Sequence, residues 1–167
     1  MEPWRRLDLA RPDQARDLLR ICCGASRWID RMLRRRPFGS LERLLESARE
    51  EWFALDARDW QEAFSHHPKI GDREALRLRF GQTRHLSERE QEGVGSASDQ
   101  VLTSLADLNR QYEEKFGYIF IVCATGRSAA EMLELLRARL DHDPGEEIRI
   151  AAAEQAKITE LRLRAIW

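Results

Sequence analysis

The sequence of 167 residues has few features of a secreted, disulfide-bonded or membrane-spanning protein. Its three cysteines include an adjacent pair, Cys22 and Cys23, which does not suit a conventional disulfide framework. No apolar stretch approaches the roughly 20 residues that span a bilayer, and the first residues lack the apolar region of a signal peptide. These absences favour buried thiols, a reducing compartment and a cytoplasmic location, with no membrane partner.

An excess of one charge and the spacing of metal ligands are also missing. The formal net charge is -1, so no general positive field exists to attract nucleic acid. The local exception is a cluster of four arginines between Arg31 and Arg36, which we interpret as a solvated helix end rather than a nucleic-acid patch. Paired cysteines or histidines at zinc-site spacing do not occur. We therefore expect no metal, no cofactor and no nucleic-acid partner.

Helical patterns fill most of the chain. A hydrophobic content of 43% can support one domain with a real core, and we expect a single all-α domain over residues 1–167, with about seven to nine helices. The expected N-caps are Ser26, Ser40, Asp56 and Ser128, and helices should end at Gly24, Pro37 and Gly117. Apolar residues recur at helical spacing in 18–22, 28–33, 41–52, 60–64, 101–115, 132–140 and 150–161, and weakly in 73–80.

The last helix should follow Pro144 and run through Ile150, Ala153, Ala156, Ile158 and Leu161. One segment differs from the helical pattern, because residues 118–124 form a β-rich apolar run between two helices. A single strand cannot satisfy its own backbone hydrogen bonds. The run is therefore either a buried extended connector paired with side chains or water, or a segment whose backbone binds a ligand.

The most informative motif is His66-His67-Pro68. Pro68 disfavours the α conformation for the residue before it and lacks a backbone donor, so a helix containing Trp60 and Phe64 should end near His67. An unperturbed histidine titrates at about pH 6.5, so its ring can exchange a proton at physiological pH. The motif alone leaves two interpretations open, a plain helix boundary and a proton-transfer group.

Ser87, Glu90 and Gln91 place a hydroxyl, a carboxylate and an amide within five residues. Locally, Ser87 and Glu90 match the S-x-x-E capping box. A carboxylate that faces an imidazole can also divide acid and base roles with it when their pKa values differ. The two interpretations are compatible, since Ser87 can begin a helix while Glu90 and Gln91 project toward His67.

Five short motifs lie along nearly the whole chain. They are His67-Pro68-x-Ile70-Gly71-Asp72, Ser87-x-x-Glu90-Gln91-x-Gly93, Lys115-Phe116-Gly117-Tyr118-x-Phe120-x-x-Cys123, Gly126-x-Ser128 and Glu154-x-x-Lys157-Ile158-x-x-Leu161-Arg162-Leu163. Each motif is weak alone, but all five in this order and at these separations are very improbable by chance. In these motifs the sequence resembles the family of 2-oxo-4-hydroxy-4-carboxy-5-ureidoimidazoline (OHCU) decarboxylases, which act between urate and (S)-allantoin.

The resemblance implies an all-helical, cofactor-free and typically homodimeric enzyme whose small-molecule substrate is OHCU. By position, His67 resembles the catalytic histidine and Glu90 its partner carboxylate, and we expect His67 to donate the final proton. The matched substrate-binding positions are Pro68, Ser87, Gln91, Phe120, Ile121, Val122, Cys123, Ala124 and Arg162. The alternatives are a non-catalytic helical interaction module and a lyase or hydrolase that acts on a related ureide.

Overall fold

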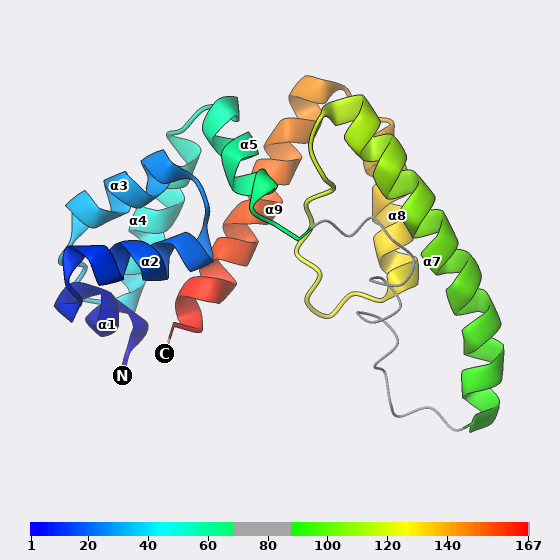
Figure 1. The fold of residues 1–167 in the computed structure, drawn as a ribbon, viewed down its shortest axis with the longest axis horizontal. Helices are drawn as coiled ribbons and strands as arrows, with labels where there is room; N and C mark the ends of the chain where they lie inside the picture. The colour runs from blue at the N-terminus through cyan, green and yellow to red at the C-terminus, as the bar shows by residue number, and fades with distance from the viewer. Residues whose placement is uncertain (69–87, 167) are drawn as a thin grey trace. The chain divides into compact units, whose positions relative to one another are not determined.

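A computed structural model describes the backbone of residues 1–68 and 88–166, and the side chains of these residues except 88–98. Within these ranges the chain is helical and contains no strand (Figure 1). The all-α class is therefore confirmed, and the eight helices described fall within the expected number. They are α1 (Pro3–Leu9), α2 (Pro12–Cys22), α3 (Ser26–Arg35), α4 (Leu41–Phe53), α5 (Ala57–Ser65), α7 (Glu88–Phe116), α8 (Ala129–Leu140) and α9 (Pro144–Arg164).

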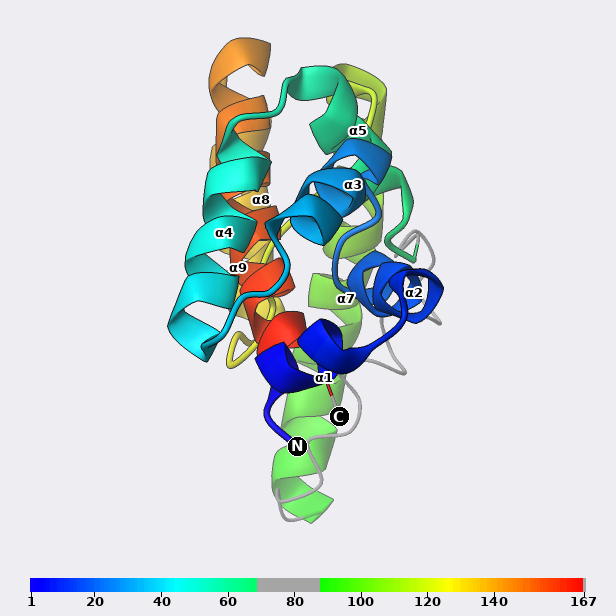
Figure 2. The same cartoon turned by 90° about the vertical axis from the view of Figure 1, so that its left-hand side faces the viewer.

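The chain forms two compact units. The first unit contains residues 1–67, 121–123 and 148–167, and the second contains residues 68–120 and 124–147. Each unit is assembled from separated stretches of the sequence, so the chain does not divide into successive domains. In the first unit, helices α1 to α5 pack together, and the part of α9 from Ile148 onward belongs to them (Figure 2).

Three of the four expected N-caps are confirmed. The Ser40 and Ser128 hydroxyls accept hydrogen bonds from the third residue of α4 and of α8, and the Asp56 carboxylate accepts two from the first turn of α5. The prediction for Ser26 is wrong, since α3 begins at Ser26 itself and Ala25 is its N-cap. The Ser26 backbone N–H instead donates to the Glu62 carboxylate, which ties the start of α3 to α5.

The predicted helix ends agree with the structure at some positions and differ from it at others. Gly117 adopts a φ of +83° directly after α7, which is the left-handed conformation expected of a glycine at a helix end. Gly24 lies two residues beyond α2 and has no positive φ, so it does not close that helix in this way. Residues 119–124 form neither helix nor strand, and Ile121 within them is buried. The expected helical segment 73–80 lies outside the described residues.

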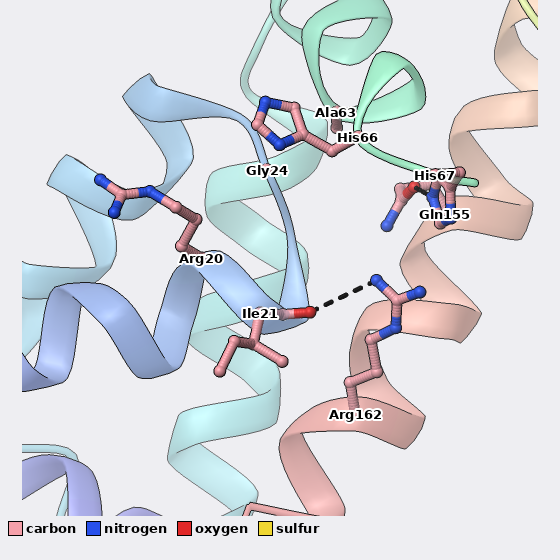
Figure 3. A pocket seen from close by; sticks show the side chains of 8 residues that line it. All are labelled: Arg20, Ile21, Gly24, Ala63, His66, His67, Gln155 and Arg162. Atoms are coloured by element: carbon pink, nitrogen blue, oxygen red, sulfur yellow. Dashed lines mark hydrogen bonds between the residues drawn. The ribbon is translucent and has the colours of Figure 1, made fainter. Parts of the chain in front are cut away.

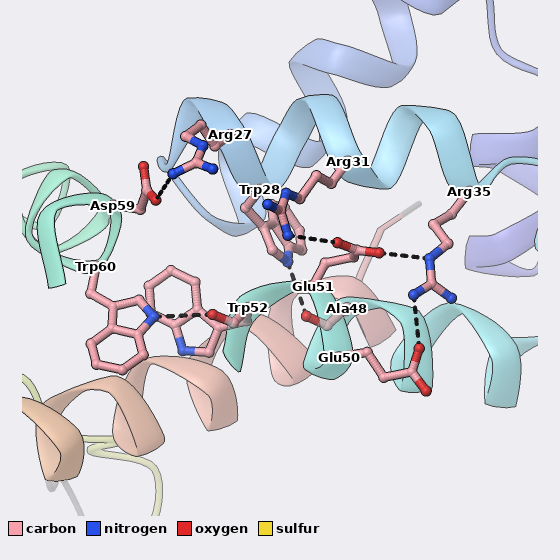
Figure 4. A network of polar contacts seen from close by, with 10 residues as sticks. All are labelled: Arg27, Trp28, Arg31, Arg35, Ala48, Glu50, Glu51, Trp52, Asp59 and Trp60. Atoms are coloured by element: carbon pink, nitrogen blue, oxygen red, sulfur yellow. Dashed lines mark hydrogen bonds and ion pairs between the residues drawn. The ribbon is translucent and has the colours of Figure 1, made fainter. Parts of the chain in front are cut away.

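Tryptophan side chains fix α9 within the first unit. The indole N–H of Trp52 in α4 donates to the carbonyl of Ala152 in α9 at 2.8 Å, and both residues are buried. Trp28 in α3 donates in the same way to the Ala48 carbonyl of α4 at 3.0 Å (Figure 4). A buried indole N–H needs an acceptor, so these bonds set how α3 and α9 lie on α4.

The arginine cluster ends α3, as expected, but three of its four arginines bind partners within the first unit. Arg35 pairs with Glu50 at 2.9 Å and with Glu51 at 2.7 Å, and Arg31 lies 3.5 Å from Glu51 (Figure 4). Arg36 donates to two backbone carbonyls at the end of α1. The cluster therefore holds α3 against α4 and α1.

The second unit has α7 and α8 side by side (Figure 1) and a buried charge cluster beside them. Glu147 is 0% exposed and accepts hydrogen bonds from Tyr112 at 2.5 Å and from Arg139 Nε at 2.7 Å. His142 Nδ1 lies 3.0 Å from the second carboxylate oxygen of Glu147. We name Tyr112, Arg139, His142 and Glu147 the Glu147 cluster. Among the described residues, no helix is long and apolar enough to cross a membrane.

Candidate active site

A cavity of about 380 Å³ opens in the first unit, between α2, α5 and α9 (Figure 3). Two histidines come from the end of α5, and an amide and a guanidinium come from α9. The cavity is therefore polar and carries positive charge, which suits a small anionic molecule. Its lining residues are Arg20, Ile21, Gly24, Ala63, His66, His67, Gln155 and Arg162.

His67 reaches the cavity because α5 ends where the sequence predicts. The helix stops at Ser65, and the backbone N–H groups of His66 and His67 donate to the carbonyls of Ala63 and Phe64 at 3.1 and 3.2 Å. Pro68 follows and has no N–H with which to continue the helix. The imidazole is half-buried, and its Nε2 lies 2.5 Å from the Gln155 amide oxygen.

The surroundings of His67 favour its neutral form. Burial lowers the pKa of the ring from its ordinary value of 6.5, and the hydrogen bond to Gln155 partly opposes this effect. The positive charge of Arg162 and the neighbouring His66 lower the pKa further. At pH 7 the ring is therefore mostly neutral, and one of its nitrogens can accept a proton.

Arg162 supplies a fixed positive charge to the same cavity. It lies on the last turns of α9, and its guanidinium donates to the Ile21 carbonyl near the end of α2 at 3.4 Å (Figure 3). A guanidinium held by one carbonyl keeps further donors for a ligand, and it recognises carboxylates with two parallel hydrogen bonds. Arg162 is therefore suited to hold the carboxylate of a small molecule.

Position 24 needs a glycine because the His66 side chain lies very close to its Cα, and not because its backbone has a positive φ. A Cβ at this position would lie 2.7 Å from His66 Cδ2 and closer still to Cγ. The His66 ring thus occupies the space that any other residue at position 24 would fill. Its placement on Gly24 fixes the end of α5, from which His67 extends.

We predict that Gly24→Ala destabilises the protein by about 1–3 kcal/mol, the usual cost of an added methyl in a packed position. Thermal unfolding followed by circular dichroism measures the loss. In a His66→Gly background the clashing atoms are gone, so the same substitution should have little further effect. An equal loss in both backgrounds would show that the His66 contact is not the cause.

The structure brings together two of the predicted site residues, His67 and Arg162, in one cavity. Ile121, Val122 and Cys123 belong to the same unit. Pro68 follows His67 directly and is exposed. Phe120 and Ala124 belong to the second unit, where the Phe120 ring packs on Arg139. Ser87 lies outside the described residues, as do the side chains of Glu90 and Gln91 in the first turn of α7.

Sequence reasoning missed Gln155, Arg20, His66 and Gly24 as lining residues. The structure places Gln155 on the buried face of α9, where residues recur at a spacing of four, at Ala151, Gln155, Thr159 and Leu163. Two of these four side chains are polar. Polar side chains in the middle of a buried helix face must have hydrogen-bond partners, and such a position is a reasonable candidate for a functional site.

The cysteines behave as buried thiols, as the sequence predicts. Burial raises the pKa of both Cys22 and Cys23 to about 12, so neither is a nucleophile at neutral pH. Both are reduced in the structure, as is the half-buried Cys123. Where side chains are described, no group of three or more histidine, cysteine or acidic residues is arranged to hold a metal ion.

Comparison with known proteins identifies the family. The model of the OHCU decarboxylase family matches residues 9–164, which is nearly the whole chain. The chain belongs to this family. It is 39% identical over 152 residues to the uric acid degradation bifunctional protein TTL of Arabidopsis thaliana, covering 90% of this chain and 47% of that protein. This chain thus spans about half the length of the plant relative.

Relatives closer to its own length also carry the family's name. The OHCU decarboxylase of Mus musculus is 36% identical over 134 residues, covering 77% of this chain and 71% of the mouse protein. A crystal structure of OHCU decarboxylase in the presence of (S)-allantoin superposes with a TM-score of 0.70 at 38% identity, over 88% of this chain and 94% of that one. An (S)-allantoin synthase structure has the same TM-score at 16% identity and shows the shared fold alone, over 97% of this chain and 53% of that one.

Proposed function

We propose that the protein decarboxylates OHCU to (S)-allantoin in urate degradation. The observation that carries this proposal is the shared cavity of His67 and Arg162, which joins a neutral proton-transfer group to a fixed carboxylate-binding group. The family of the chain supports the choice of substrate. A non-catalytic interaction module would have no need for these two groups in one cavity.

The reaction needs one bond broken and one proton placed. When the carbon–carbon bond to the carboxylate breaks, carbon dioxide leaves and its electron pair remains on the ring carbon. The conjugated ring system of the substrate accepts this pair, so the substrate supplies its own electron sink. The protein then has to bind the substrate carboxylate, orient the ring and deliver a proton to the neighbouring ring carbon, which bears the ureido group.

Arg162 binds the carboxylate by charge-assisted hydrogen bonds before it is expelled. His67 accepts the proton of the ring hydroxyl, which becomes a carbonyl, and returns a proton to the ring carbon that bears the ureido group, with Glu90 as its partner acid or base. Acid–base catalysis of this kind contributes typically about 10²–10⁴-fold to the rate. Ser87, Gln91 and the backbone of residues 120–124 bind the urea-like N–H and C=O groups. In this proposal no cofactor takes part, the enzyme is a homodimer and it acts in the cytoplasm.

The stereochemistry of the product tests this proposal. A proton delivered from one face of a bound planar intermediate gives one hand of allantoin, whereas spontaneous decay of OHCU gives both. We expect circular dichroism to show accumulation of the S enantiomer when purified protein is added to OHCU, also after exhaustive chelation. Racemic product at the uncatalysed rate would refute the proposal. Faster consumption of 5-hydroxyisourate or allantoin than of OHCU would favour the related-ureide alternative.

A further inference from the structure

A buried hydrogen-bond chain runs behind His67 and is not explained by packing alone. Gln155 is 0% exposed, and both ends of its amide are bonded. Its oxygen faces His67 Nε2, and its nitrogen donates to the Thr159 hydroxyl at 3.0 Å. Since a buried amide is costly unless both ends are satisfied, its orientation is tightly constrained.

Thr159 sets the direction of this chain. Its hydroxyl oxygen accepts the hydrogen bond from the Gln155 NH₂ group at 3.0 Å. An amide that donates through its NH₂ group at one end presents its oxygen, which only accepts, at the other end. The Gln155 oxygen is then the end that faces His67.

A carbonyl oxygen only accepts hydrogen bonds, so the His67 nitrogen that faces it must carry a hydrogen. We propose that Gln155 is a positioning residue, which holds the neutral His67 ring in the tautomer with hydrogen on Nε2 and the lone pair on Nδ1. Nδ1 is then the nitrogen that exchanges a proton with substrate. This inference deepens the proposed function and rests on it for its catalytic meaning, but the tautomer itself is a property of the free protein.

A neutral amide suits this task better than a carboxylate. A carboxylate beside the ring would stabilise the imidazolium and raise its pKa, as opposite charges within hydrogen-bond distance do. An amide fixes the ring orientation without adding a charge, and burial and Arg162 keep the ring neutral. The general base of many enzymes is oriented by a third group in the same manner.

Nitrogen-15 NMR of the histidine rings tests the inference without substrate. The His67 signals are assigned by their loss in His67→Ala. In the wild-type protein the neutral ring should have its hydrogen on Nε2. In Gln155→Met, which keeps size and removes the acceptor, the ring should become a mixture of both tautomers. In Gln155→Glu its pKa should rise by about one unit or more.

The matched control is Leu163→Met, since Leu163 lies two turns along the same buried face of α9 and away from the cavity lining. It disturbs the packing of α9 to a similar degree and should leave the His67 tautomer unchanged. An unchanged tautomer in Gln155→Met, or an equal change in Leu163→Met, would overturn the inference. These outcomes do not depend on whether the protein decarboxylates OHCU.

Kinetics then connect the tautomer to catalysis. In Gln155→Met we expect kcat to fall about 10–100-fold, the range found when a hydrogen-bond partner that orients a metal-binding histidine is lost, with KM nearly unchanged. Thr159→Val should show a smaller loss in the same direction, and Thr159→Ser, which keeps the hydroxyl, should recover it. In Gln155→Glu the acid limb of the kcat/KM profile should move to higher pH. A loss confined to KM would assign Gln155 to binding and refute its positioning role.

Discussion

His67→Ala lowers turnover of OHCU by about 10²–10⁴-fold, because it removes the proton-transfer group of the proposed site. Thermal stability should remain close to that of the wild-type protein, since His67 is only half-buried and water can replace its ring in an open cavity. Steady-state kinetics and thermal unfolding of the same preparation check both expectations. Turnover above about one tenth of the wild-type value is too high for a lost acid–base group and would remove His67 from the mechanism.

Chemical rescue separates a catalytic from a structural role for His67. Free imidazole can enter the cavity of about 380 Å³, so it should restore part of the turnover of His67→Ala and have no such effect on the wild-type protein. The pH profile gives a second readout. Protonation of His67 removes the base, so wild-type kcat/KM should fall as the pH drops through a pKa below 6.5, and His67→Ala should lose this limb.

The sequence predicts local features of this fold well. The caps at Ser40, Asp56 and Ser128 and the helix end at Gly117 depend on residues within one turn of the position concerned. The exit of α5 before Pro68 is equally local. For this reason the placement of His67 could be predicted, whereas the chemical state of its ring could not.

Features that depend on distant partners were missed. The predicted path of the last helix through Ala153 and Leu161 is confirmed, but Ala153 is exposed and Leu161 is 43% exposed, while the buried face carries Gln155 and Thr159. Gln155 lies there because its partner is His67, 88 residues away in the sequence. A hydrophobic pattern cannot reveal a polar residue that is buried by such a bond.

Helix α1 was not predicted for a similar reason. It has seven residues, too few for stability on its own, and Leu7 is its buried residue. Its end is held from about thirty residues away, where Asp8 accepts hydrogen bonds from the backbone N–H groups of Phe38 and Gly39 at 2.8 and 2.9 Å. The assignments of Ser87, Glu90 and Gln91 stay predictions.

The largest effect on stability is expected at Glu147, which the sequence did not single out. Glu147→Ala leaves Arg139, itself 5% exposed, without its carboxylate, and breaking a buried ion pair by removing one partner costs about 3–5 kcal/mol. For a chain of this length, a loss of about 3 kcal/mol lowers Tm by about 6–12 °C. Thermal and urea unfolding measure the change. The matched control is Glu146→Ala, since Glu146 is exposed in the same first turn of α9 and should cause a much smaller shift.

A double substitution shows whether the cost comes from the uncompensated charge. In Arg139→Met/Glu147→Leu no buried charge is left unpaired, and replacing a buried ion pair with apolar residues is often nearly neutral. The double variant should therefore be more stable than Glu147→Ala, although Tyr112 loses its acceptor in both. If Glu147→Ala is as stable as Glu146→Ala, the Glu147 cluster does not stabilise the second unit. If the double variant is no more stable than Glu147→Ala, the loss comes from packing and hydrogen bonds rather than from the buried charge of Arg139.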